Sequence, residues 1–215
     1  MEQESIKTIT CDACKQNECA FGYPEGMPSY CEGQRYLDLL NETKTEYFKP
    51  ENAEIHKATA KILSLGHDQW TRLEESIEFA KELGVSRIGL AICVGLIREG
   101  REFARFFRRA GFEVMSVACM MGGVGDTETG IPEEYAYPTR TTCNPIAQAE
   151  ILNREQTELN FTVGLCLGHD ILFMRHSEAL VAPLVVKDRV LVNNPSAVLY
   201  SMYHRQRLVD KYGRG

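Results

Sequence analysis

The sequence lacks any long apolar run. The longest candidate, Val85 to Leu96, is interrupted by Arg87 and falls short of the roughly 18 residues that a membrane helix needs. The first residues, Met1 to Lys7, contain neither the basic segment nor the apolar segment of a secretory signal. We therefore expect a soluble protein of the reducing cytoplasm, with no membrane partner, in which structural disulfides are uncommon.

An excess of positive charge is also absent. The chain of 215 residues has 24 Lys and Arg against 30 Asp and Glu, which gives a net charge of −6. This balance gives no chain-wide basic surface for nucleic acid, so no nucleic-acid partner is expected. One basic cluster lies on a predicted helix whose other face is apolar, and we interpret it as a solvent-facing helix surface: Arg98, Arg101, Arg105, Arg108 and Arg109.

Residues 11–33 have little from which to build a hydrophobic core, because glycine and proline recur among their cysteines. The cysteines follow the pattern C-x2-C-x4-C-x11-C at Cys11, Cys14, Cys19 and Cys31. A C-x2-C pair supplies two thiolates from one tight turn, and two later thiolates complete tetrahedral zinc. We predict a zinc-binding module over residues 1–35. A 4Fe-4S cluster also takes four thiolates, and buried inert cysteines are the third alternative.

Residues 36–215 are predicted to form one α/β domain. Helical periodicity over residues 53–65 and 69–83 is followed by an alternation of strands and helices. The strands are expected at residues 87–94, 112–120, 161–167 and 180–186, with helices at 96–110 and 145–156 between them. Such alternation predicts a mostly parallel sheet with flanking helices, a Rossmann-like arrangement of three layers. Lys187, Asp188 and Arg189 are expected to form a hairpin turn, followed by a last helix capped by Ser196.

Four further cysteines recur along this domain, at Cys93, Cys119, Cys143 and Cys166. Three of them fall at the carboxyl ends of predicted strands, which is where ligands bind in open α/β sheets. Cys143 precedes Asn144 and Pro145, a fitting N-cap and first helical residue, so its thiol lies at the positive end of a helix dipole. We expect the four thiols to line one crevice and to bind a metal ion or a 4Fe-4S cluster. For each strand cysteine, a small apolar core residue is the alternative.

A histidine and a carboxylate follow Cys166 closely, at His169 and Asp170. A thiolate, an imidazole and a carboxylate in one crevice could act as nucleophile or ligand, proton shuttle and orienting group. The alternative function is therefore a cysteine-dependent or iron–sulfur-dependent enzyme acting on a small-molecule substrate, with Cys143, Cys166, His169 and Asp170 as catalytic residues.

The glycine-rich run Gly122 to Asp126 invites comparison with phosphate-binding loops. It does not fit the G-x-G-x-x-G pattern, because Glu128 stands at the place of the third glycine. We interpret this run as a flexible loop over the crevice.

Several segments resemble a known family. The runs Cys143 to Ala149, Gly164 to Asp170 and Val186 to Val190 are similar to an uncharacterised family of anaerobic bacteria and archaea described as predicted metal-binding proteins, and the N-terminal cysteine cluster matches as well. The resemblance implies metal binding and names no reaction. One departure is Asn193, where the family favours histidine; if that histidine is a ligand, this chain lacks it.

Overall fold

The computed structural model describes residues 11–16, 18–22, 26–28, 30–136 and 138–213. The chain divides into two compact units, Met1–Lys61 and Ile62–Gly215. Among the described residues, no helix is both long enough and apolar enough to cross a bilayer. The module predicted over residues 1–35 is shorter than the first unit, and its first ten residues lie outside the described ones.

The first unit is built from short helical turns. In chain order these are η1 (Cys11–Ala13), η2 (Glu18–Phe21), α1 (Glu32–Arg35), α2 (Leu37–Thr43) and η4 (Lys44–Phe48), followed by the long helix α3 (Pro50–Gly66) that continues into the second unit. None of the residues described before Ala58 is buried. This segment therefore has no hydrophobic core of its own, as its composition predicts.

The second unit holds a sheet of four parallel strands. They are β1 (Arg87–Ile92), β2 (Glu113–Ala118), β3 (Leu159–Val163) and β4 (Leu180–Val185), in the spatial order β2-β1-β3-β4. The helices α4 (Arg72–Glu82), α5 (Ile97–Arg109), α6 (Pro145–Arg154) and α7 (Leu167–His176) accompany them. The predicted α/β class with a parallel sheet and flanking helices is confirmed.

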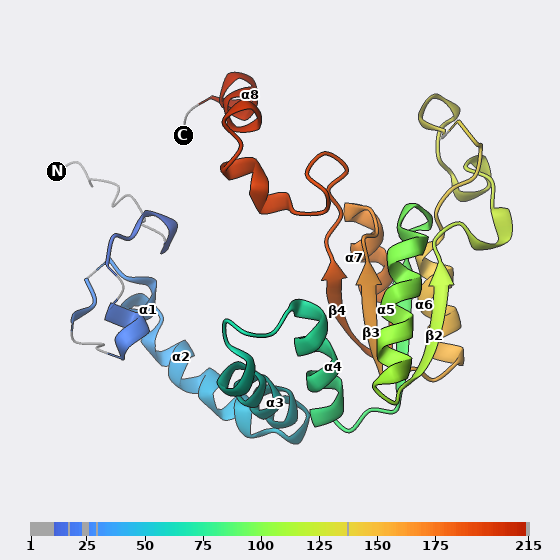
Figure 1. Cartoon of the computed structure of the whole chain (residues 1–215). Coiled ribbons are helices and arrows are strands. Elements are labelled where there is room, and N and C mark those ends of the chain that lie inside the picture. The colour runs from blue at the N-terminus through green and yellow to red at the C-terminus, as the bar shows by residue number, and fades with distance from the viewer. Residues whose placement is uncertain (1–10, 17, 23–25, 29, 137, 214–215) are drawn as a thin grey trace. The chain divides into compact units, whose positions relative to one another are not determined.

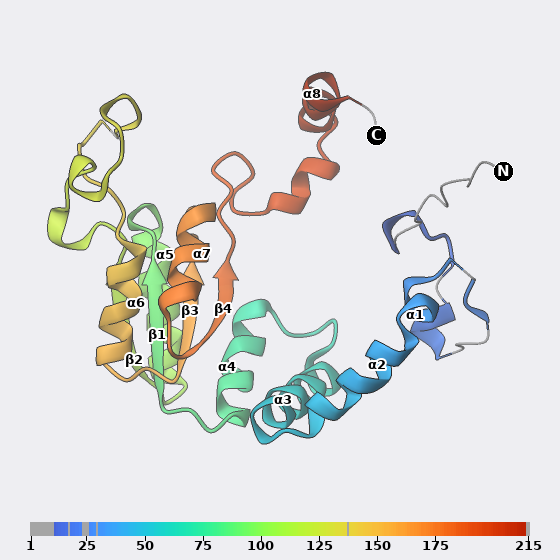
Figure 2. The same cartoon turned by 180° about the vertical axis from the view of Figure 1, so that it is seen from behind.

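The helices cover the two faces of the sheet in separate layers (Figures 1 and 2). On one face Ile88, Leu90 and Ile92 of β1 pack with Ala80 of α4 and Phe107 of α5. The opposite face, covered by α6 and α7, has a second cluster, which includes Ala91, Cys93, Val117, Cys119, Ala149, Leu152, Leu165 and Phe173. Successive residues of β1 alternate between the two clusters, as strand geometry requires. Cys93 and Cys119 therefore belong to the α6/α7 face.

Strand order creates a topological switch point at the carboxyl edge of the sheet. From β1 the chain leads through α5 to β2, and from β3 it leads through α7 to β4, so neighbouring strands β1 and β3 send their connections in opposite directions. Such a topological switch point leaves space between the two departing loops, and ligands bind there in open α/β sheets. The residues that follow β1 and β3 are consequently the first candidates for a site.

The last part of the chain differs from the prediction. No hairpin forms among the described residues around Lys187, because β4 ends at Val185 and a turn-rich loop follows. Two helical segments come next, η9 (Pro195–Leu199) and α8 (Met202–Tyr212), and the cap of α8 is Ser201, whose hydroxyl accepts from the His204 N–H. The predicted cap at Ser196 is wrong, since Pro195 places Ser196 inside the short helix η9.

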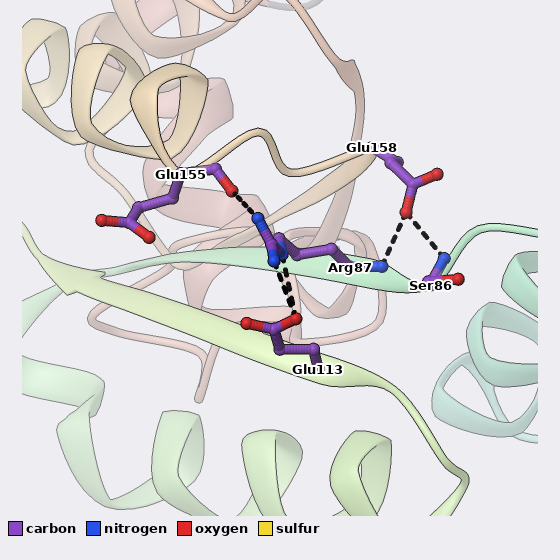
Figure 3. Close-up of polar contacts among 5 residues, drawn as sticks. All are labelled: Ser86, Arg87, Glu113, Glu155 and Glu158. Atoms are coloured by element: carbon purple, nitrogen blue, oxygen red, sulfur yellow. Dashed lines mark hydrogen bonds and ion pairs between the residues drawn. The ribbon is translucent and has the colours of Figure 1, made fainter.

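The amino edge of the sheet is closed by a network of polar contacts (Figure 3). The Arg87 guanidinium donates to the Glu113 carboxylate, at 3.1 and 2.9 Å, and to the backbone carbonyl of Glu155, at 2.7 Å. The Glu158 carboxylate accepts from the backbone N–H groups of Ser86 and Arg87, at 2.7 and 2.8 Å. These contacts tie the starts of β1, β2 and β3 to one another.

Candidate functional site

Cys93 and Cys119 lie side by side immediately after β1 and β2. The two strands pair in register up to Ile92 and Ala118, and the N–H of Cys119 donates to the Ile92 carbonyl at 2.8 Å. Both thiols are buried, with 7% of Cys93 and 1% of Cys119 exposed. The backbone N–H of Val94 donates to the Cys119 sulfur at 3.3 Å. The prediction that Cys93 and Cys119 lie at the carboxyl ends of strands is confirmed.

Cys143 lies beside Cys119, at the end of the segment that leads from β2 to α6. Its Sγ lies 3.4 Å from the Sγ of Cys119, and the next residue, Asn144, donates its N–H to the Cys119 carbonyl at 2.7 Å. Asn144 caps α6 by accepting from the Ala147 N–H at 3.0 Å, and Pro145 is the first helical residue. The predicted helix start is therefore confirmed, and Cys143 stands half-buried just before it.

The three thiols share one hydrogen-bonded row, which sets the order in which they ionise. The hydrogen bond with Cys119 lowers the pKa of Cys143 below that of an ordinary thiol, and the same contact raises the pKa of Cys119. Its hydrogen bond to Cys119, together with burial, raises the pKa of Cys93 to about 12, although Lys187 opposes this shift. Cys143 therefore ionises first, with Cys119 as the donor to its thiolate.

Cys166 is close to this row but not in its direct contact. It lies three residues beyond β3, as the N-cap of α7, so the predicted strand over 161–167 extends too far. The chain turns at Gly164, whose φ is +59° and whose position would bring any Cβ onto Leu96. Cys166 is near enough to Cys143 to raise the pKa of that thiol by charge repulsion. All four cysteines of the second set thus lie at the carboxyl edge, but Cys166 does not contact the other three thiols directly.

Two basic side chains contact the thiols, although they were predicted to lie in a hairpin turn. Lys187 Nζ lies 2.8 Å from Cys93 Sγ, and Arg189 Nη2 lies 3.1 Å from Cys166 Sγ. Lysine and arginine can only donate, so each sulfur is the acceptor in its contact. A signal for this role was present in the run Val186 to Val190, which carries part of the family resemblance.

The loop that carries these cations is held by its own polar side chains. Asp188 Oδ1 accepts from the N–H groups of Val190 and Leu191, at 2.9 and 2.8 Å, and the Asp188 N–H donates to Asn193 Oδ1 at 3.1 Å. Asn193 adopts a φ of +57°, a conformation that asparagine tolerates well. In this chain the Asn193 side chain therefore closes the loop that brings Lys187 and Arg189 to the sulfurs.

Buried polar atoms without a hydrogen-bond partner cluster on the α6/α7 face of the sheet. They are Gln148 Oε1, Thr162 Oγ1, His169 Nδ1 and Asp170 Oδ1, and a fifth such atom, Glu18 Oε2, belongs to the first unit. Gln148 is fully buried, and its amide nitrogen donates to the carbonyls of Ile92 and Val117, next to Cys93 and Cys119. Unpaired buried polar atoms are costly in proteins, so this concentration makes the face a candidate for ligand binding, although Thr162 and Asp170 also interact with each other. Gln148 was missed, although it is a polar residue on the buried face of an amphipathic helix and lies in the run Cys143 to Ala149 that carries part of the family resemblance.

Burial keeps both titratable groups at the start of α7 closer to neutral. It lowers the pKa of His169 and raises the pKa of Asp170, although the neighbouring Thr162 hydroxyl opposes the shift of Asp170. Cys93 and Arg189 also act electrostatically on His169, so this ring lies near both residues. His169 is therefore held as a neutral imidazole, the form that binds metal ions and accepts protons.

The N-terminal cysteines are less closely grouped. Cys11 and Cys19 are exposed, Cys14 donates to the Gln16 carbonyl at 3.3 Å, and Cys31 contacts the Met27 sulfur at 3.6 Å. Burial and the neighbouring Cys14 thiol, followed by Cys31, raise the pKa of Tyr30, so Cys14 and Cys31 lie near one ring. Within the described part of this segment, no sulfur–sulfur contact joins the four thiols.

Neither cysteine set is arranged as a finished metal site. As the side chains stand, no three His, Cys, Asp or Glu residues in the described ranges could hold a metal ion together. The carboxyl-edge set nevertheless combines four thiols, two cations, an imidazole and a carboxyl group. Such a set can bind a soft metal ion, ionise a thiol or hold an anionic group.

Comparison with known proteins identifies the family of the chain. The family described as "Protein of unknown function (DUF1847)" matches residues 31–184, a range that contains Cys93, Cys119, Cys143 and Cys166. The uncharacterized protein MJ0455 of Methanocaldococcus jannaschii is 39% identical over 173 residues, which cover 80% of this chain and 89% of that protein. The chain belongs to the DUF1847 family.

Proposed function

We propose that this protein binds a soft metal ion through the four thiols of the carboxyl edge, Cys93, Cys119, Cys143 and Cys166. The observation that carries the proposal is the grouping of the first three thiols at the topological switch point, where the hydrogen bond with Cys119 lowers the pKa of Cys143. Thiolates are the ligands that zinc and other soft ions prefer.

The spacing of the sulfurs supports a single ion over a cluster. Two thiolates on one tetrahedral zinc, each about 2.3 Å from the metal, lie about 3.8 Å apart. Cys119 and Cys143 are separated by 3.4 Å, so only a small outward adjustment of these side chains is needed. In a 4Fe-4S cluster each thiolate binds a different iron, which requires a wider arrangement. A zinc-like ion therefore fits this set better than a 4Fe-4S cluster does.

The cations of the 187–194 loop fit a metal–thiolate centre. Three or four thiolates on a divalent ion leave a net negative charge, and hydrogen bonds from Lys187 and Arg189 to the sulfurs would offset it. Gln148 and His169 lie around the same centre and could orient ligands or complete the coordination.

Metal analysis of two complementary variants tests this proposal. In one variant Cys11, Cys14, Cys19 and Cys31 are all replaced by serine, and in the other Cys93, Cys119 and Cys143 are replaced. After anaerobic purification, the first variant should keep one equivalent of metal without acid-labile sulfide, and the second should lose that equivalent. Equal metal content in both variants and in the wild type would refute the carboxyl-edge site.

The N-terminal set is proposed as a second, structural zinc site. Its support is the cysteine spacing in a segment that has no hydrophobic core, together with the proximity of Cys14 and Cys31 to Tyr30. Structural zinc contributes on the order of 10 kcal/mol of binding free energy, enough to order such a segment.

All eight cysteines are unpaired, which is typical of a reducing compartment, so we place the protein in the cytoplasm.

A second candidate function is a thiol-dependent enzyme acting on a small anionic substrate. The observation that favours it is the lowered pKa of Cys143 in a crevice that also holds Lys187, Arg189 and the neutral His169. Cys143 would attack the substrate, His169 would transfer protons, and the cations with the start of α7 would hold the anionic group.

Anion binding distinguishes this candidate from simple metal storage. Thermal-shift titrations with inorganic phosphate and with small carboxylates should stabilise the wild type at millimolar concentrations. Arg189→Ala should abolish the shift, whereas Arg207→Ala, which removes an equal charge from α8, should preserve it. Equal responses from the two variants would count against a substrate site at the carboxyl edge.

A further inference from the structure

Cys119 and Cys143 are placed to react with each other. Their sulfurs are 3.4 Å apart, and the bond of a disulfide is about 2.05 Å long, so closing the pair requires about 1.4 Å of approach. The two segments are already fixed together, because the Asn144 N–H donates to the Cys119 carbonyl at 2.7 Å. The backbones that carry the two thiols therefore already lie close together, and the sulfurs have only a short distance to close.

The other cysteines nearby are held by basic side chains. Cys93 also forms a hydrogen bond with Cys119, but the two residues follow paired strands, so their side chains project side by side. The Cys93 sulfur is held by Lys187 Nζ at 2.8 Å. Cys166 is held in the same way by Arg189 at 3.1 Å. Cys119 and Cys143 are therefore the favoured pair.

Solvent access assigns different roles to the two thiols. Cys143 is half-buried, whereas Cys119 has only 1% of its surface exposed. A dissolved reagent consequently meets Cys143 first, and Cys119 lies behind it within bonding reach. This order of an accessible and a protected thiol is the arrangement of a dithiol that exchanges with external disulfides.

We propose that Cys143 and Cys119 form a redox-active dithiol that exchanges with low-molecular-weight disulfides, with Cys143 as the attacking thiol and Cys119 as the resolving one. The Cys143 thiolate attacks one sulfur of the small disulfide, whose sulfur–sulfur bond breaks and releases one thiolate. The Cys119 thiol then gives its proton to solvent and attacks the Cys143 sulfur. This second step expels the other half of the reagent as a thiolate. The protein loses two electrons, and the reagent is reduced to two thiols.

The dithiol would couple the oxidation state of its surroundings to metal binding, a consequence that rests on the metal site proposed above. A disulfide between Cys119 and Cys143 removes two of the four proposed ligands, so oxidation releases the ion. Conversely, a bound ion occupies both sulfurs and blocks the exchange. The carboxyl edge would then hold metal only while the cell interior is reducing.

Peptide mapping of the full-length protein tests the dithiol directly. Tryptic cleavage at lysine and arginine places the four carboxyl-edge cysteines on four separate peptides: Ile88–Arg98, Ala110–Arg140, Thr141–Arg154 and Glu155–Arg175. Metal-free, reduced protein is treated with oxidised glutathione, and the remaining thiols are blocked with N-ethylmaleimide. We expect a disulfide that joins Ala110–Arg140 to Thr141–Arg154, and dithiothreitol should reverse it.

Three variants separate the roles. Cys119→Ala should stop at a stable glutathione adduct on Cys143, and Cys143→Ser should form no disulfide among the remaining carboxyl-edge cysteines. Cys93→Ser is the matched control, which should form the disulfide as the wild type does. A bond between Cys93 and Cys119, a first adduct on Cys93 or Cys166, or a wild type that forms no disulfide would overturn the proposal.

A parallel arm with zinc-loaded protein keeps the two proposals distinguishable. If zinc binds at the carboxyl edge, it should slow disulfide formation at least tenfold. If the disulfide forms equally fast with and without zinc, the dithiol stands and the metal site fails. If zinc is bound but the metal-free protein forms no disulfide, the metal site stands and the dithiol fails.

Discussion

The two edges of the parallel sheet are made from the same strands, but their chemistry is different. At the amino edge, Arg87, Glu113 and Glu158 join the strand starts through short contacts within the protein (Figure 3). At the carboxyl edge, thiols meet cations, and buried atoms of His169 and Asp170 have no hydrogen-bond partner. The amino edge is complete in itself, whereas the carboxyl edge has unused bonding capacity. That difference is the reason why we propose ligand binding at the carboxyl edge and a stabilising role for the amino edge.

The largest expected effect on stability comes from one residue that does not follow this division between the two edges. Gly164 lies at the carboxyl edge, but its substitution should act on stability, because alanine would adopt a φ of +59° and its Cβ would meet Leu96. Left-handed strain and overpacking together should lower the free energy of unfolding by about 3 kcal/mol. Denaturant unfolding of Gly164→Ala measures this cost.

Gly130→Ala is the matched control for that substitution. Gly130 has a φ of +79° and no atom within 4 Å of the position that a Cβ would occupy. Only the backbone strain remains, so this variant should lose about 1 to 2 kcal/mol. Equal losses in the two variants would contradict the close packing of Gly164 against Leu96.

A second test sharpens the comparison within the carboxyl edge. In metal-free protein, iodoacetamide should modify Cys143 much faster than Cys93 at pH 7, because the pKa of Cys143 lies below 9.0 and that of Cys93 is raised to about 12. The thiolate fraction of Cys93 is then at least about a thousandfold smaller, and its greater intrinsic nucleophilicity reduces the rate difference to about thirtyfold. Burial of Cys93 adds to the difference.

The direction of the pH dependence follows from the same shifts. An acid with a lowered pKa forms its reactive anion at lower pH, so the midpoint of the Cys143 labelling curve should lie below pH 9, whereas the labelling rate of Cys93 should still rise above pH 10. Mass spectrometry of the labelled peptides across this range provides both curves. Coincident midpoints would contradict the hydrogen-bonded row of thiols.

A smaller effect is expected from the cation that contacts Cys93. Lys187→Ala removes a hydrogen bond to a proposed ligand and should weaken zinc binding about tenfold, the lower end of the range for outer-shell partners. Lys211→Ala removes the same charge from α8 and should leave the affinity unchanged. Competition with a chelator of known affinity measures both variants. A weaker site in the Lys211 variant would point to net charge as the cause.

The smallest effect should come from the amino edge. Glu158→Ala removes an exposed carboxylate that accepts from two backbone N–H groups. The free energy of unfolding should fall by about 1 kcal/mol, and the melting temperature by about 3 °C. Metal content should not change. Glu155→Ala is the control, because Arg87 binds the carbonyl of Glu155 and not its carboxylate. Loss of metal from the Glu158 variant would show that the two edges are coupled.

Much of the fold follows from local patterns in the sequence. The strand beginning at Arg87, the basic outer face of α5 and the capped start of α6 at Asn144 each depend on residues close in the chain. The alternation of strands and helices then determines a parallel sheet. Cys93 and Cys119 could be placed at the carboxyl edge because each directly follows an apolar strand.

The contacts that define the candidate site depend on residues far apart in the chain. Lys187 and Cys93 are separated by 94 positions, and no periodicity connects them. The loop that brings Lys187 to Cys93 contains Val192 and Asn193, which both have a positive φ. A valine in the sequence does not predict that conformation, because β-branched residues rarely adopt it. The strand order, which creates the switch point, is likewise set by packing of whole elements.

X-ray absorption spectroscopy at the zinc edge tests the central claim most directly. The sample is the variant in which Cys11, Cys14, Cys19 and Cys31 are serine, so that only the carboxyl edge can supply several thiolates. We predict one zinc per chain with three or four sulfur ligands at about 2.3 Å and no neighbouring metal. A zinc bound only by oxygen and nitrogen, or a variant that retains no metal, would contradict a metal site at the carboxyl edge.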